Sequence, residues 1–248
     1  MSGHSKWATI KRKKGAVDAK RGKIFSKVIK EITVAARLGG GDPGGNPRLR
    51  RALDLARSTN MPADNITRAI KKGTGELEGT VYEELVYEGV GPGGVLFLVD
   101  VVTDNRNRTA PELRKLLDKH GGQLGAAGSA AWAFDQKGIL NLPRSAATEE
   151  QLFELAVGAG AEDVAGDDET WTVTTPRELL DAVRDALESA GVALSESGLQ
   201  YIPKTPKLLD GDDAAKMLAI LESLDDHDDV GAVASEADFT DAALEAAN

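Results

Sequence analysis

The chain has 248 residues, of which 41% are hydrophobic and 28% are charged, and this is enough for two or three domains that each have a core. It contains no cysteine, which excludes disulfides, thiolate metal sites and a cysteine nucleophile, and which fits a reducing compartment. The formal net charge of −10 is unevenly spread, because residues 1–72 hold 18 lysines and arginines against five acidic residues. A basic N-terminal part joined to an acidic remainder predicts that the N-terminal part binds a polyanion.

The expected location is the cytoplasm. No stretch of about 18 apolar residues occurs, so we expect no segment that spans a membrane. The positive charges at the N-terminus are not followed by the apolar run of a secretory signal. We therefore expect no membrane partner.

Residues 2–17 predict a flexible basic arm. The segment has no acidic residue and contains one large aromatic side chain. Basic side chains neutralise phosphates and release counterions, and an aromatic ring can stack on an unpaired base, so this composition suits a nucleic acid. A solubilising or targeting tail is the alternative. The residues of the arm that we expect to contact nucleic acid are Lys6, Trp7, Lys11, Arg12, Lys13 and Lys14.

The pattern from residue 18 to residue 38 predicts an amphipathic helix. At about 100° per residue, its apolar side chains fall on one face and most of its lysines on the neighbouring face. Such a helix packs into a core and displays a cationic ridge roughly 25 Å long. A basic amphipathic helix can also lie on an anionic membrane, but an apolar face rich in alanine and isoleucine argues against this. The expected nucleic-acid contacts on this helix are Lys20, Arg21, Lys23, Lys27 and Lys30.

Two further helices are expected to complete a small basic bundle. Residues 39–47 form a glycine-rich hinge, and Asn46 followed by Pro47 predicts the start of the second helix. The third helix is expected to end at Lys72, with Gly73 as its cap. A helix-turn-helix is not favoured, because the third helix offers few side chains that could contact base edges.

Beyond this bundle the composition changes to that of strands. β-Branched runs at 81–90 and 95–102, joined by a glycine-rich turn, predict a hairpin. Thr109 and Glu112 predict a capping box that opens a helix. Residues 130–134 then predict a further strand.

The loop between the hairpin and this helix carries the last two candidate contacts, Arg106 and Arg108. At a strand-to-helix loop, backbone N–H groups and guanidinium groups can both meet a phosphate. The alternative is an internal network that holds the loop against acidic neighbours in the same chain. Both interpretations stay open at this point.

A second unit follows, with the order strand, helix, two strands, helix, strand, which is the ferredoxin-like split arrangement. A helix at about 212–224 and a strand at about 230–234 have no partners in it, so we expect them to complete the first unit. The fold class is therefore α+β, with an N-terminal helical bundle and two α/β, ferredoxin-like domains, one inserted in the other. The expected domains are 1–75 for the basic helical part with its arm, 76–135 plus 207–248 for the α/β domain, and 136–206 for the inserted ferredoxin-like domain.

Few residues suggest chemistry. The three histidines lie far apart, and no hydrolase, zinc-peptidase or dinucleotide motif occurs. His227 lies in the acidic run 225–229, which could bind a divalent cation, although such runs are more often solvated. We therefore expect no enzyme activity, no catalytic residue, no cofactor and no metal. The acidic domains are expected to be scaffolds that offer a surface to a protein partner.

Several blocks of the sequence resemble the YebC/PmpR family, over essentially the whole chain. The blocks are GHSKW at 3–7, DAKRGKIFSK at 18–27, AARLGGGDP at 35–43, NPRLR at 46–50, YEGVGPGG at 87–94, DNRNRT at 104–109 and GAEDV at 160–164. The resemblance implies a helical N-terminal domain plus two α/β domains, one inserted in the other. Members of the family are described as DNA-binding transcriptional regulators. Others, including mitochondrial relatives, are described as translational activators that act with the ribosome on proline-rich nascent chains.

The residues favour one of these roles. A sequence-specific DNA regulator presents a recognition helix to base edges, whereas this chain offers phosphate-binding charge and an arm with a tryptophan. Recognition of shape and backbone, as in structured RNA, suits these residues better. We therefore expect a non-enzymatic regulator of gene expression that associates with rRNA or the ribosome and aids proline-rich synthesis. The alternatives are a DNA-binding transcriptional regulator and, second, a protein-interaction adaptor.

Overall fold

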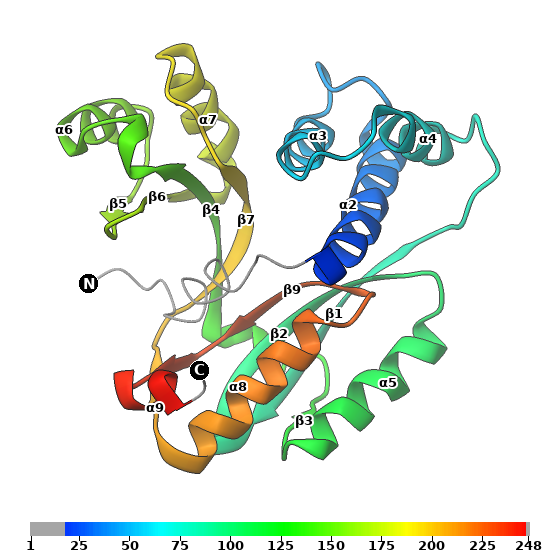
Figure 1. Ribbon diagram of the computed structural model, residues 1–248, viewed down its shortest axis with the longest axis vertical. Helices are drawn as coiled ribbons and strands as arrows, with labels where there is room; N and C mark the ends of the chain where they lie inside the picture. The colour runs from blue at the N-terminus through cyan, green and yellow to red at the C-terminus, as the bar shows by residue number, and fades with distance from the viewer. Residues whose placement is uncertain (1–17, 247–248) are drawn as a thin grey trace.

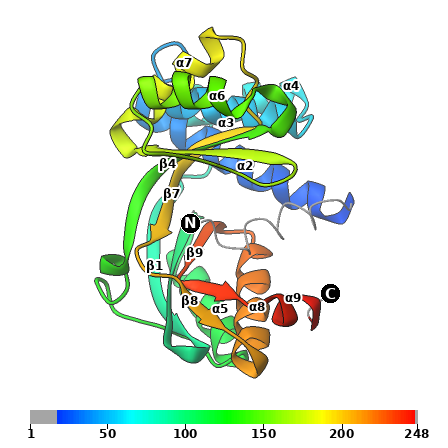
Figure 2. The same cartoon turned by 90° about the vertical axis from the view of Figure 1, so that its left-hand side faces the viewer.

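The structure is a computed structural model that describes residues 18–246, with side chains from residue 22 onward. In that part the chain forms a helical region and two antiparallel four-stranded sheets, so the expected α+β class is confirmed. Figures 1 and 2 show two upper lobes, one of helices and one built around β4 and β7, above a lower sheet. The six contacts expected in residues 2–17, and the side chains of Lys20 and Arg21, lie outside the described residues.

Three helices of the described part form the N-terminal region. They are α2 Asp18–Gly39, α3 Pro47–Ser58 and α4 Ala63–Thr74. Their apolar faces meet in a small core that includes Val28, Ile32 and Leu49. Asn46 caps α3 as predicted, since its Oδ1 accepts a hydrogen bond from the N–H of Leu49.

The cap predicted at Gly73 is wrong. α4 continues to Thr74 and is ended by Gly75, whose φ of 83° lies in the left-handed region. Gly73 lies instead where α4 crosses α2, and a Cβ there would overlap the backbone oxygen of Thr33. The two helices can approach so closely because Gly73 has no side chain.

The first sheet joins strands that are far apart in sequence. In spatial order its strands are β3 Gln123–Leu124, β1 Glu83–Gly91, β2 Val95–Thr103 and β9 Val230–Ser235, and all neighbours are antiparallel. Helices α5 Arg106–Lys119 and α8 Gly211–Asp225 pack on one face, with Phe97, Leu117 and Leu221 in the shared core. As predicted, the late helix and strand complete this sheet.

The strand predicted at 130–134 is wrong. A 3₁₀ turn occupies Ala131–Ala133, and the small third strand is β3 instead. The reason is the buried carboxylate of Glu88, which accepts three backbone N–H groups of residues 128–131 at 2.5–2.7 Å. Those N–H groups cannot also join a strand ladder. Burial by itself would raise the pKa of Glu88, but the three backbone hydrogen bonds outweigh it and lower the pKa.

The capping box predicted at Thr109 and Glu112 is wrong as well. α5 begins four residues earlier, at Arg106, and Asn105 caps it by accepting the N–H groups of residues 107 and 108. The hydroxyl of Thr109 is therefore free of the capping role and donates to a buried carboxylate, which is described below.

The second sheet has the predicted ferredoxin-like order. Its strands in space are β5 Asp163–Gly166, β6 Thr170–Pro176, β4 Phe134–Pro143 and β7 Glu196–Pro203. All neighbours are antiparallel. Its helices are α6 Glu149–Leu152, which continues as a π-helical turn Phe153–Val157, and α7 Leu180–Ser189. Thr148 and Gln151 form a capping box at the start of α6.

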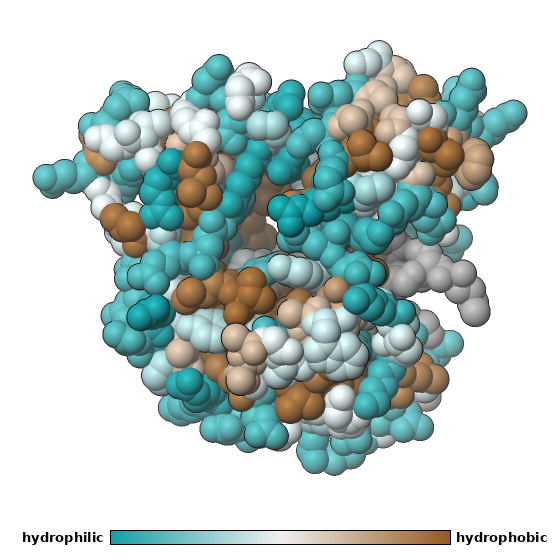
Figure 3. Space-filling model, turned by 180° about the vertical axis from the view of Figure 1, so that it is seen from behind, coloured by the Kyte–Doolittle hydropathy of each residue, from teal (hydrophilic) through white to brown (hydrophobic). Residues whose placement is uncertain are grey.

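Short elements complete the described chain. They are the parallel strands β8 Lys207–Leu209 and β10 Ala237–Phe239, and the helix α9 Asp241–Ala246. Seen from behind, the molecule is hollowed between its two upper lobes (Figure 3). The helical region and each four-stranded sheet have an apolar cluster of their own. The division into domains 1–75, 76–135 plus 207–248, and 136–206 stays a proposal. Among residues 18–246, no helix has both the length and the apolarity that a membrane span needs.

Candidate nucleic-acid interface

Three lysines of α2 point toward one acidic segment. Lys23, Lys27 and Lys30 stand about one helical turn apart and form what we call the lysine stripe. Opposite them lie residues 225–229, which close α8, lead into β9 and contain four aspartates and one histidine; we call them the acidic segment. Figures 1 and 2 show the start of α2 above the end of α8, where this segment begins.

Each lysine of the stripe donates to a main-chain oxygen of the acidic segment. The Nζ atoms and their carbonyl acceptors are Lys23 with Asp226 at 3.0 Å, Lys27 with Asp225, and Lys30 with Asp228 at 2.9 Å. The last turn of α8 carries the negative end of the helix dipole, which adds to the attraction. The carboxylate of Asp226 is 4.0 Å from Lys23 Nζ, and both side chains are about half exposed. This ion pair therefore contributes at most about 1 kcal/mol.

Asp229 is the buried end of the acidic segment. Its carboxylate is 5% exposed, and one oxygen lies 2.6 Å from Lys30 Nζ. The other oxygen accepts from Arg108 Nη2 and Thr109 Oγ1, both at 2.7 Å, and from Thr103 Oγ1 at 3.2 Å. Burial by itself would raise the pKa of Asp229, but the hydrogen bonds from the lysine, the arginine and the threonine outweigh it and hold the pKa well below its usual range. Asp229 thus ties α2 to the end of β2 and to the first turn of α5.

Arg106 and Arg108 were expected in the loop before this helix, but both lie in the first turn of α5, and they differ. Arg108 belongs to the internal network, since its Nη2 is 2.7 Å from Asp229 and 3.0 Å from Asp104. The side chain of Arg106 is exposed and makes no ion pair with any described residue. The internal-network interpretation therefore describes Arg108, and a nucleic-acid contact stays a prediction for Arg106.

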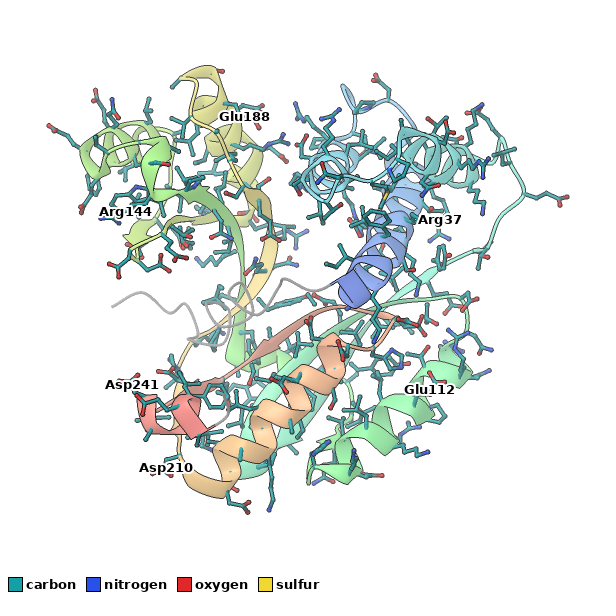
Figure 4. All side chains as sticks on the ribbon, in the orientation of Figure 1. Arg37, Glu112, Arg144, Glu188, Asp210 and Asp241 are labelled. Atoms are coloured by element: carbon teal, nitrogen blue, oxygen red, sulfur yellow. The ribbon has the colours of Figure 1, made fainter. Side chains whose placement is uncertain are left out.

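An open cavity of about 640 Å³ lies between α2, the start of α5 and the acidic segment, with Glu112 on its α5 side (Figure 4). Its wall carries three cationic side chains and five carboxylates, so charges of both signs face it. His227 also lines the cavity. Its Nε2 is 3.2 Å from a carboxylate oxygen of Glu112, and its Nδ1 accepts the N–H of Asp229 at 3.1 Å. Among the described side chains, no group of three histidines or carboxylates is arranged to hold a metal.

Arginines of α3 also form ion pairs with other parts of the chain. Arg48 binds both carboxylate oxygens of Glu31 at 2.7 and 2.8 Å and reaches Glu84 at 2.6 Å. Three further ion pairs join α3 to α7. They are Arg51 with Asp181, Arg184 with Asp54 and, at 3.9 Å, Arg50 with Asp185. Much of the described positive charge of the helical region is therefore used to hold that region against the two sheets.

The sequence does not single out Asp229, because acidic runs such as 225–229 are more often solvated. The lysine stripe and the acidic segment lie about two hundred residues apart, and no local pattern indicates such a pair. The available signal was weaker: two segments of opposite charge, each next to an apolar element. The structure brings together Lys23, Lys27, Lys30 and Arg108, and leaves Arg106 outside their network.

A second unusual carboxylate lies on the other face of the first sheet. Phe97, Val99 and Val101 of β2 point into the core under α5 and α8, so Asp100 faces away from it. Burial, followed by the negative charge of the nearby Glu84 and of a second glutamate, raises the pKa of Asp100 to about 6. Asp100 therefore takes up a proton more readily than an ordinary aspartate.

Two family models match the chain. Residues 5–76 match the model described as the TACO1/YebC protein N-terminal domain. Residues 82–237 match the model described as the TACO1/YebC second and third domain. The two matches cover the helical region and most of both sheets.

Bacterial relatives are similar over their whole length. The chain is 52% identical over 245 residues to a protein of Chlorobium chlorochromatii, 54% over 246 residues to one of Desulfotalea psychrophila, and 54% over 245 residues to one of Geobacter sulfurreducens. Each match covers 98–99% of both chains, and each relative is named a probable transcriptional regulatory protein. The fold is similar to the crystal structure of a conserved hypothetical protein of Aquifex aeolicus, with a TM-score of 0.86 and 45% identity over 92% of this chain and 94% of that one.

Proposed function

The chain belongs to the TACO1/YebC family, which confirms the resemblance, and from this premise we propose that it is a regulator of gene expression that acts by binding nucleic acid, without catalysis. We propose further that its target is RNA in or near the ribosome, and that it aids the synthesis of proline-rich chains.

The lysine stripe is the observation that carries this proposal. Its three Nζ atoms already donate to carbonyl and carboxylate oxygens, which are acceptors of the same kind as phosphate oxygens. Cations spaced one turn apart along a helix suit a row of backbone phosphates, and such contacts position a nucleic acid without distinguishing its bases. Recognition of backbone and shape is typical of structured RNA.

The test is co-sedimentation with bacterial ribosomes at about 150 mM salt, with random duplex DNA in excess as competitor. The wild-type protein is expected to stay with the ribosome. An arm variant is expected to lose most of this association, because phosphate contacts there depend on its charge. The arm variant changes Lys6, Lys11, Arg12, Lys13 and Lys14 to glutamine. It changes no residue of the lysine stripe or of the acidic segment.

One result speaks against RNA as the target, and another speaks against the arm as part of the interface. Release of the protein by random DNA means that ribosome binding was only a matter of charge. Sedimentation of the arm variant at the wild-type level removes the basic arm from the interface. If binding survives competition, a translation assay follows, in which the protein should raise the yield of a reporter with consecutive prolines over one with alanines in their place.

The names of the relatives favour a second candidate, a DNA-binding transcriptional regulator. This candidate predicts that some duplex sequence binds about a thousandfold or more tightly than random DNA at the same salt. Selection from a random duplex library, followed by competition with unselected DNA, distinguishes it from the RNA proposal.

A further inference from the structure

The acidic segment lies on the part of α2 where a nucleic-acid backbone is proposed to bind. Its carbonyl oxygens accept from all three lysines of the stripe, and four of its five side chains are aspartates. To a lysine, a row of carbonyl and carboxylate oxygens resembles a row of phosphate oxygens. The segment thus occupies the stripe in the way that a polyanion would.

We propose that the acidic segment is a built-in competitor of nucleic acid, and that a polyanion gains the lysine stripe by displacing residues 225–228 from it. This inference rests on the proposed function, because it concerns the same lysines. The partner that fits is a phosphodiester backbone with several closely spaced phosphates, since a single small anion replaces only one of the contacts.

The solvent exposure of the contacts decreases along the stripe from Lys23 to Lys30. The side chains of Lys23 and Asp226 are 46% and 63% exposed, whereas those of Lys30 and Asp229 are 15% and 5% exposed. An incoming phosphate therefore meets Lys23 first, since its side chain is the more exposed of the two lysines that line the open cavity. At the other end, Asp229 is held by Arg108 as well as by Lys30. Displacement thus begins at the exposed end of the stripe and stops at the buried one.

The displaced segment does not leave the site. Residues 225–228 stay tethered between α8 and the buried Asp229, so their return to the lysines is an intramolecular event. Short tethers of this kind give effective concentrations in the millimolar range. A sparse or weakly bound anion loses this competition, and a dense array of phosphates wins it. The segment therefore raises the threshold for binding.

The test compares two triple variants with the same change of charge. The segment variant is Asp225→Asn with Asp226→Asn and Asp228→Asn, and the control variant is Asp210→Asn with Asp212→Asn and Asp213→Asn. The control changes the opposite end of the same helix, α8, which has 15 residues. The two ends lie about 20 Å apart. This exceeds twice the Debye length of about 8 Å at physiological salt, so the control charges act weakly on the stripe.

The probe is a fluorescein-labelled RNA duplex of about 20 base pairs, titrated at about 150 mM salt. We expect the segment variant to bind about tenfold more tightly than the wild type, and the control variant to stay within about twofold. Equal tightening in both variants means that only net charge matters and overturns the inference. Unchanged or weaker binding by the segment variant also overturns it.

A second measurement uses the wild-type protein alone. The amides of Asp226, His227 and Val230 donate to carbonyl oxygens within or just before the segment. Their hydrogen exchange should become faster when the probe binds, because the segment leaves the stripe. Slower or unchanged exchange refutes displacement. If the wild-type protein binds neither the probe nor ribosomes, the proposed function and this inference are refuted together. If the wild-type protein binds the probe but the segment variant binds it no more tightly, displacement alone is refuted.

Discussion

Replacement of Asp229 with asparagine removes the negative charge between Lys30 and Arg108 while keeping the shape of the side chain. Loss of one partner from a buried ion pair costs about 3–5 kcal/mol. The lower end applies here, because Lys30 keeps carbonyl acceptors at Val102 and Asp228, and Arg108 is 43% exposed. We therefore expect Asp229→Asn to destabilise the protein by about 3 kcal/mol at neutral pH.

The assay is thermal unfolding followed by circular dichroism or calorimetry. In a protein of this size, 1 kcal/mol corresponds to about 2–4 °C, so the Tm should fall by about 6–12 °C. Asp228→Asn is the matched control, because that side chain is exposed and adjacent in sequence. The control should change stability by less than about 0.5 kcal/mol.

The pH dependence gives a second check on Asp229. Its pKa is lowered in the folded protein, so its contribution is fully present above the pKa of an unfolded aspartate, about 3.9, and is lost as the pH falls toward the folded value. Asparagine does not titrate. The stability difference between wild type and variant should therefore shrink by about 1 kcal/mol between about pH 7 and pH 3. A Tm that falls by less than about 2 °C, or a difference that is the same at both pH values, refutes the account of Asp229.

Three further predictions concern the fold. Gly73→Ala should destabilise the protein by about 1–3 kcal/mol, because the new Cβ would overlap the backbone oxygen of Thr33. Gly158→Ala, which has open space around it, should be neutral or slightly stabilising. Urea unfolding of the two variants checks this. Glu88→Gln should lower the Tm by several degrees, since an amide N–H₂ cannot accept all the backbone donors, and an unchanged Tm contradicts this. Asp100→Asn should stabilise the protein by about 2–3 kcal/mol at about pH 8 and hardly at pH 4. Burial and the charge of Glu84 raise the pKa of Asp100 to about 6, so ionisation of the wild-type carboxyl costs stability as the pH rises to that value. Equal Tm shifts at the two pH values contradict this.

The order of the elements could be predicted because it depends on local chemistry. Apolar periodicity, the Asn46 cap and the glycine-rich turns between strands each act within a few residues. The insertion of one domain in the other could be predicted by counting elements. The late helix and strand have no partners in the second unit, so they had to pack on the earlier sheet. The strand at 130–134 failed because its backbone donors are taken by Glu88, some forty residues earlier, and an apolar run does not show this.

The candidate site was predictable only in part. The sequence shows the sign and the spacing of the charges, so it predicts that the lysines of α2 form a cationic ridge on one side of the helix. It does not show which charges meet, and the partners of Lys23, Lys27 and Lys30 are set by the packing of α2 against the end of α8. Thr109 was assigned to a cap by its spacing from Glu112, whereas its hydroxyl is fixed by a carboxylate from the far end of the chain. Long-range polar contacts of this kind leave no periodic signal.

The pairing of β2 with β9 has a consequence for how the chain is made. β2 leaves the ribosome early, but the strand and the helix that cover it, β9 and α8, are synthesised only after the whole second sheet. The second sheet is contiguous in sequence and can fold as it emerges, whereas the first sheet must wait with an open edge and an apolar face that only α5 covers. A nascent chain that ends before residue 230 therefore carries an exposed strand edge, even when its ferredoxin-like unit is already complete.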